Sequence, residues 1–222
     1  GVENISYQED FYSSKLGMNI KTHAKGSSPV YISGGLVRLN DRYDFTMDLA
    51  STLLPSTIDE TWNGSNGTIQ SNAFDATLSS MQFLGHYKFT NNHRFVLGPT
   101  FKYNSYKRYD FKDANPTDTY IDSNGATQPL VIDETDGILL EERVATLYAT
   151  AGYWYESVPH STPNTPRVRG NILFGLPVWN NASNTGFEGV EFSSTNGYKF
   201  EANGFIGYPI MNGLEVGLFG GY

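Results

Sequence analysis

Residues 198–208 read YKFEANGFIGY, and nearly every second side chain in this stretch is apolar. The alternation sets Tyr198, Phe200, Ala202, Gly204, Ile206 and Tyr208 against Lys199, Glu201, Asn203, Phe205 and Gly207. A β-strand points successive side chains to opposite faces, so this spacing predicts a strand with one apolar and one mostly polar face. Strands of about ten residues with this pattern are the repeating unit of a transmembrane β-barrel.

The same period recurs along the chain. Reading for it predicts nine strands, at about 10–23, 30–39, 42–54, 73–89, 93–110, 141–157, 167–179, 196–209 and 213–222. Pro99 and Pro177 fall inside two of these strands, where we expect a bulge or a strand end because proline has no N–H donor. We therefore predict an all-β chain, with residues 1–222 forming a single antiparallel, up-and-down transmembrane barrel of about ten strands.

Composition narrows the class of protein. Phe, Trp and Tyr make up 14% of the 222 residues, yet the mean hydropathy is -0.39. A net charge of -8 argues against nucleic-acid binding, because the phosphate backbone needs a basic surface. The lack of cysteine excludes disulfides and cysteine-ligated metals. The chain has no run of about 18 apolar residues, which excludes a membrane-spanning helix. A soluble protein or a barrel remains.

The connections between the predicted strands alternate in length. Tight turns are expected at 40–41, 90–92 and 212–213, and polar loops at about 55–72, 111–140 and 180–195. Barrels of the bacterial outer membrane have short periplasmic turns and longer extracellular loops, so the three polar loops are expected at the cell surface. The connection 158–166 falls on the short-turn side, although it is longer than the others there.

The nine predicted strands make an odd number. Single-chain bacterial barrels have an even number, with both chain ends in the periplasm. We therefore expect a tenth strand to be missing from this chain, and an export signal to have been removed from its first residues. In the alternative, Tyr222 ends the barrel and 10–23 is not a strand.

Aromatic side chains gather near both ends of the predicted strands, as in the girdles of membrane barrels. Those near the short turns are Phe45, Phe89, Phe95, Tyr153, Trp154, Tyr155 and Tyr208, and those near the long loops are Tyr106, Tyr109, Phe111, Trp179 and Tyr198. In a soluble β-sandwich, the alternative fold, the aromatics would fill a core between two sheets. The barrel is favoured because sandwich strands are shorter and their inner faces less polar.

Charges of both signs fall on the polar face of the predicted strands. They are Asp44, Asp48, Asp75, Lys102, Arg167, Arg169, Lys199, Glu201 and Glu215. A charge facing lipid at mid-depth costs about 2–4 kcal/mol, so these side chains are expected to point into the lumen and to pair. Because about ten strands enclose an interior that side chains largely fill, an ion-paired plug is favoured over a selective pore.

The sequence gives little sign of catalytic or metal chemistry. Loop 110–137 is acidic, but its match to a calcium-binding loop fails at Tyr120 and Val131, so we expect a solvated loop and neither a metal nor a cofactor. No GxSxG, HExxH or Walker motif is present.

The order of these parts resembles that of the omptins, which are ten-stranded outer-membrane proteases. The segments VYISGGLVRLNDRYDFTMDLASTLLP (30–55), DETW (59–62) and FDATLSSMQFLGHYKFTNNHRFVLGPTFKYNSYKRYDF (74–111) carry the resemblance, mostly through their strand rhythm. The resemblance implies an Asp pair facing an Asp–His pair at the extracellular rim. Asp59 and Glu60 are the only candidates for the first pair, and WNNASNTGFEGVEF (179–192) supplies neither Asp nor His for the second. Only His23, from a neighbouring loop, could substitute.

We therefore expect a barrel in the bacterial outer membrane with a structural or binding role. It would act through its extracellular loops or as the membrane anchor of an assembly. The alternatives are an omptin-like rim hydrolase, a small porin-like pore and, at the level of the fold, a soluble β-protein. The expected partners are outer-membrane lipid and lipopolysaccharide, together with other envelope or surface proteins.

Overall fold

The computed structural model describes residues 1–13, 17–65, 67–113, 119–121, 124–129, 140–157, 165–185, 191–211 and 214–222. The strands are β1 (Val2–Ser13), β2 (Met18–Arg38), β3 (Tyr43–Thr52), β4 (Ser56–Gly64), β5 (Gly67–Lys88), β6 (His93–Asp113), β7 (Thr119–Ile121), β8 (Thr127–Pro129), β9 (Leu140–Glu156), β10 (Arg167–Asn184), β11 (Glu191–Phe192), β12 (Lys199–Met211) and β13 (Leu214–Gly221). The described residues include no helix that is long and apolar enough to cross a membrane.

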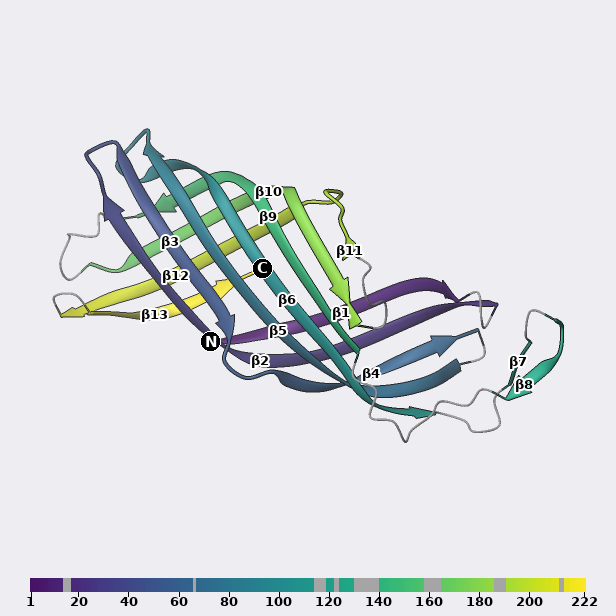
Figure 1. Ribbon diagram of the computed structural model, residues 1–222. Helices are drawn as coiled ribbons and strands as arrows, with labels where there is room; N and C mark the ends of the chain where they lie inside the picture. The colour runs from purple at the N-terminus through teal and green to yellow at the C-terminus, as the bar shows by residue number, and fades with distance from the viewer. Residues whose placement is uncertain are drawn as a thin grey trace.

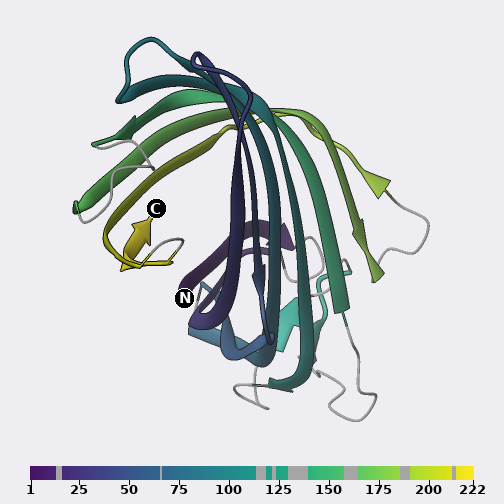
Figure 2. The same ribbon diagram turned by 90° about the vertical axis from the view of Figure 1, so that its left-hand side faces the viewer.

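One large antiparallel sheet forms most of the molecule and curls into a barrel (Figures 1 and 2). Its strand order is β1-β2-β3-β5-β6-β9-β10-β12-β13, with β4 between β2 and β5 and with β11 beside β10. This single curled sheet bears out the prediction of a barrel over a sandwich of two sheets. Strands β7 and β8 form a separate hairpin.

The sheet has two parts, and the three long strands β2, β5 and β6 run through both of them. The part that we call the arm contains β1, residues 18–29 of β2, β4, residues 67–78 of β5, residues 105–113 of β6 and residues 140–143 of β9. It extends beyond one end of the barrel (Figure 1). The part that we call the wall contains the rest of these three long strands and of β9, together with β3, β10, β12 and β13.

The predicted strand at 10–23 is wrong. Residues 10–13 end β1 and residues 18–23 begin β2, and these two segments pair with each other, so that Asp10 faces Lys21. Gly17 makes the turn between them: it has a φ of 65°, and its N–H donates to the carbonyl of Ser13 at 2.8 Å. Because β1 belongs to the arm, eight strands form the described wall. The structure therefore confirms neither the barrel of ten strands nor the odd number of strands from which a missing tenth strand was expected.

The predicted loop at 55–72 is also wrong in part. Residues 56–64 form β4 and residues 67–72 begin β5, so this segment builds the arm. The predicted turns at 40–41 and 90–92 are confirmed by backbone hydrogen bonds from Leu39 to Tyr43 and from Phe89 to His93. The turn at 212–213 and most of 158–166 lie outside the described residues.

Side chains of the wall alternate between the barrel interior and the outside. On β3, β5 and β6 the even-numbered residues point inward; Asp44, Leu84 and Val96, for example, are at most 1% exposed. The outward residues of the wall include large exposed apolar side chains, namely Tyr43, Met47, Leu49, Tyr87, Phe95, Leu97, Tyr153, Val168, Ile172, Phe174, Leu176, Phe200, Ile206, Tyr208, Val216 and Leu218.

In the arm the apolar and polar faces are exchanged. Phe74 and Ala76 on β5 point to the same side as Leu84 and are fully buried in a cluster with Ile5 and Ala24. The outward face of the arm instead carries polar residues such as Lys21, His23, Lys25, Asp59 and Asp75. Each long strand therefore reverses the chemistry of its two faces where it passes from wall to arm.

Candidate functional site

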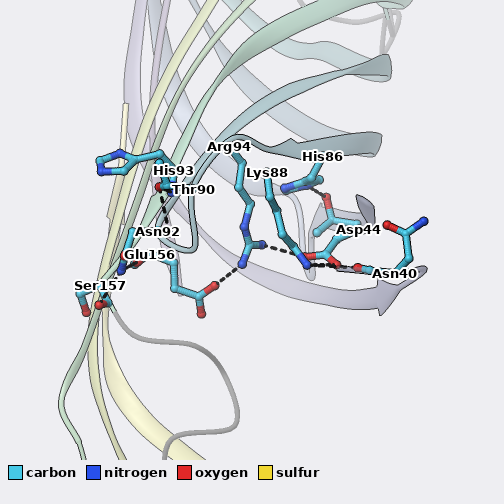
Figure 3. A network of polar contacts seen from close by, with 11 residues as sticks. Asn40, Asp44, His86, Lys88, Thr90, Asn92, His93, Arg94, Glu156 and Ser157 are labelled. Atoms are coloured by element: carbon cyan, nitrogen blue, oxygen red, sulfur yellow. Dashed lines mark hydrogen bonds and ion pairs between the residues drawn. The ribbon is translucent and has the colours of Figure 1, made fainter. Parts of the chain in front are cut away.

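A chain of buried ion pairs lies in the lumen next to the short turns (Figure 3). Asp44 on β3 lies 2.7 Å from the ammonium of Lys88 and 3.3 Å from the guanidinium of Arg94. Arg94 also donates to Glu156 at 2.7 Å, so this one cation bridges two carboxylates. The side chains of all four residues are at most 12% exposed.

Strand register brings these charges together. His86 is the cross-strand partner of Asp44, and Lys88, two residues further along β5, is the partner of Arg94. Residues two apart share a face, and so do cross-strand partners, so all four side chains point into the lumen. The alternating pattern of β3, β5 and β6 thus places one acid between two bases.

An apolar layer lies next to this polar chain. Leu84, Val96 and Leu173 are fully buried and pack together, with Trp154 against them. His86 joins the two layers: its Nε2 lies 2.8 Å from the hydroxyl of Thr46, and its ring meets that of Trp154 edge-on at 5.1 Å. The layer fills the part of the lumen next to β5, β6, β9 and β10 with side chains that neither water nor an ion can replace without exposing apolar surface.

A second polar layer crosses the lumen on the arm side of the apolar residues. Glu201 accepts from Lys199 and Lys102, each at 3.1 Å, and Lys199 also donates to Thr100 at 3.2 Å. Thr100 in turn contacts the hydroxyl of Thr150 at 2.9 Å. Lys199 is buried, whereas Lys102 is 33% exposed, so the layer has a dry side and a wet side.

The arm has its own buried ion pair. Arg108 on β6 donates to both carboxylate oxygens of Glu60 on β4, at 2.8 and 3.1 Å, and to Glu9 on β1 at 3.0 Å. Glu60 is fully buried and also accepts from Asn72 at 2.9 Å. The guanidinium lies 5.2 Å from the ring centroid of Tyr7, so Arg108 ties β1, β4 and β6 together.

Burial in the arm shifts the pKa values of the groups around Arg108. Desolvation is the main cause of a raised pKa for the phenol of Tyr7, and it raises the pKa of Tyr106 to about 12. It also raises the pKa of Glu142, and the charge of Glu9 raises it further, while Arg108 partly offsets both effects. These tyrosines are therefore neutral packing groups at neutral pH.

Of the three catalytic candidates, Asp59 and His23 share one face of the arm, and Glu60 lies on the other. Glu60 is the cross-strand partner of Ala24, and both point into the interior of the arm. Asp59 precedes Glu60 and His23 precedes Ala24, so these two side chains point to the outer face. Glu60 is occupied by Arg108. The arrangement thus offers no acid pair at one site among these three residues, and the described residues hold no cluster suited to a metal.

The predicted lumen charges fall into three groups. Asp44, Asp48, Lys102, Arg167, Arg169, Lys199 and Glu201 point into the barrel, with the guanidinium of Arg169 4.1 Å from the ring centroid of Phe205. The placement of Asp75 in the lumen is wrong: it lies in the arm on the face opposite to Phe74 and accepts a hydrogen bond from Tyr109 at 3.2 Å. The side chain of Glu215 lies outside the described part of the chain.

Sequence reasoning missed the residues that hold the networks together. Lys88, Arg94 and Glu156 stand close to predicted turns, so they were not assigned to the lumen, and Arg108 was not paired with Glu60. The signal was present, because each of the first three lies on the polar face of its strand. Extending the two-residue period to the strand ends identifies them.

Comparison with known proteins adds no identity. Neither a protein-family model nor a curated protein matches this sequence. The resemblance to omptins therefore stays a resemblance of strand rhythm, and function has to be argued from the geometry alone.

Proposed function

We propose that this protein is a β-barrel of the bacterial outer membrane with an occluded lumen, and that it holds the arm at the cell surface as a binding platform. Its partners would be outer-membrane lipid and lipopolysaccharide around the wall, and other envelope or surface proteins at the arm. An anchoring role in a larger assembly follows from the same arrangement.

The exchange of faces between wall and arm is the observation that carries this proposal. On β5 the outward residues Phe83 and Tyr87 of the wall give way to Asp75 in the arm, while the inward side changes from His86 to Phe74. A strand surrounded by water would keep its apolar face inside along its whole length. Lipid around the wall and water around the arm account for both halves.

The layered lumen supports an occluded barrel rather than a pore. The ion pairs around Arg94 and the apolar layer at Leu84 follow each other along the lumen. The side chains of both are buried or partly buried. A conducting pore needs a continuous polar path. Glu60 points away from Asp59 and His23 and is held by Arg108, so these three residues likewise give no support to a rim hydrolase.

Gel migration and planar-bilayer recording test the two parts of this proposal. The full chain, refolded in detergent, should migrate faster on a denaturing gel before boiling than after it, because a detergent-resistant barrel stays compact. It should also be silent in a planar bilayer. Unchanged migration together with monodisperse behaviour without detergent would overturn the membrane assignment, whereas regular single-channel steps would replace the occluded barrel with a pore.

A further inference from the structure

Two exposed leucines lie where the chain passes from the wall to the arm. Strand β3 ends at Thr52 beside the start of the arm, and residues 53–55 form a bend that leads to β4 (Figure 1). Leu53 and Leu54 are 61% and 67% exposed. The described arm exposes no leucine, isoleucine or methionine, so this pair belongs chemically with the apolar outer face of the wall.

Hydrogen bonds fix the backbone of this bend. The N–H of Leu53 donates to the carbonyl of Pro29 at 2.9 Å, and the hydroxyl of Ser28 donates to the carbonyl of Leu54 at 2.9 Å. Leu53 continues the alternation of β3, in which Ser51 points outward, so the side chain of Leu53 also points to the outside of the sheet. Because β3 lies between β2 and β5, the bend is away from the edges of the sheet.

The height of Leu53 along the barrel indicates what surrounds it. Successive outward residues of one strand are about 6.8 Å apart, which at a strand tilt of about 40° corresponds to about 5 Å along the barrel axis. Leu53 is the next outward residue after Ser51, which follows the last apolar outward residue of β3, Leu49. The headgroup layer on each side of a bilayer is about 5–7 Å thick, so Leu53 falls within this layer where the hydrocarbon ends at the level of Ser51.

The neighbouring side chains agree with a headgroup environment. Tyr31, the cross-strand partner of Ser51, lies on the same outer face, and tyrosine is enriched where membrane and water meet. At the level of Leu53, β5 and β6 carry Thr77 and Ser105, which are cross-strand partners. The apolar surface therefore reaches further toward the arm at the bend than it does on β5 and β6.

We propose that the bend at residues 53–55 lies in the headgroup layer of the outer leaflet and fixes the base of the arm to the lipid surface. Leu53 would pack against the upper ends of the acyl chains, and the hydrogen-bonded backbone of the bend would carry this contact into β4. The inference rests on the proposed membrane function and deepens it, because it makes lipid a partner of the arm as well as of the wall.

The test uses single cysteines, because the chain has none of its own. The variants Leu53→Cys, Asp59→Cys and Phe174→Cys are each labelled with the polarity-sensitive dye NBD. The full chain is refolded into phosphatidylcholine vesicles that contain a lipid with a nitroxide quencher either on its headgroup or on its acyl chain. Asp59, on the outer face of the arm, is the matched control for water, and Phe174, on the outward face of the wall, is the control for lipid. All three side chains are exposed, so labelling should leave the fold intact, which gel migration checks.

We expect the headgroup nitroxide to quench the dye at position 53 at least twofold more strongly than the dye at position 59, and the acyl-chain nitroxide to quench the dye at position 174. Equal quenching at positions 53 and 59 would overturn the inference, while quenching at position 174 would leave the membrane proposal standing. Blue-shifted emission at position 53 without quenching would mean that protein covers the bend, as in a dimer, and would also overturn the inference. No quenching at position 174 would overturn the membrane proposal itself, and this inference with it.

Discussion

Replacing Arg94 with methionine should lower the stability of the wall sharply. Arg94 is 4% exposed and bridges Asp44 and Glu156, while Lys88 contacts only the first of these acids. Methionine fills a similar volume but leaves Glu156 without its buried cation. Breaking a buried pair by removing one partner costs about 3–5 kcal/mol, because the remaining charge is uncompensated.

Urea unfolding of the refolded protein, followed by tryptophan fluorescence, measures this loss. At an m-value near 3 kcal/mol/M, a loss of 3–5 kcal/mol lowers the midpoint by about 1–1.7 M. Lys107→Gln is the control: its partner Glu141 is 4.0 Å away and Lys107 is 45% exposed, so it should cost less than about 1 kcal/mol. Adding Glu156→Gln to Arg94→Met should recover part of the loss. If Arg94→Met shifted the midpoint no more than Lys107→Gln, the ion-pair chain would not stabilise the wall.

Three further substitutions test the lumen, the wall and the arm. Leu173→Ala should cost about 2–5 kcal/mol in the same urea assay, because it leaves a cavity in the apolar layer, and any conductance in a planar bilayer should appear first in this variant. Phe174→Arg, on the outward face of the wall, should lower stability in lipid vesicles by about 2–4 kcal/mol, whereas Thr61→Arg on the outer face of the arm should have little effect. Glu142→Gln should stabilise the arm at pH 7, because folding raises the pKa of this carboxyl and its ionised form therefore opposes folding. The gain in stability should vanish as the pH falls below the pKa that this carboxyl has in the unfolded chain. An equal gain at pH 3 and pH 7 in urea unfolding would contradict this reasoning.

The two-residue period was enough to predict the wall but not the arm. Strands such as 167–179 show alternating apolar side chains, and the bulge expected at Pro177 is present as a register shift between Pro177 and Trp179. At Pro99 the register shifts with neither neighbour, although the pairing with β5 is interrupted between Gln82 and Gly85, so the expected bulge is absent there. The difference arises because the strands curl over many residues, and local sequence does not determine which proline lies where a shift is needed.

The arm escaped prediction because its faces carry the reverse of the wall pattern. Asp75 was assigned to the lumen on the assumption that polar residues point inward along all of β5. In the arm the inward side is the one occupied by Phe74, and Glu60 reaches it only as the partner of Arg108. Segment 55–72 looked like a loop for the same reason, because a strand surrounded by water carries many polar side chains. Pairing across strands, which one sequence does not display, decides these positions.

The outer faces of adjacent strands change from apolar to polar at nearly the same height along the barrel. Leu49, Met81 and Phe101 are cross-strand neighbours and form the last fully apolar outward row of three adjacent strands. The next outward row toward the arm contains Ser51 and Ser79, whose hydroxyl groups lie 2.8 Å apart, and continues on β6 with Tyr103. A packed protein core gives no reason for two adjacent strands to change their outer side chains from apolar to polar at one level. The surface of a hydrocarbon layer does give such a reason, because every strand that crosses it meets the change of solvent at the same height.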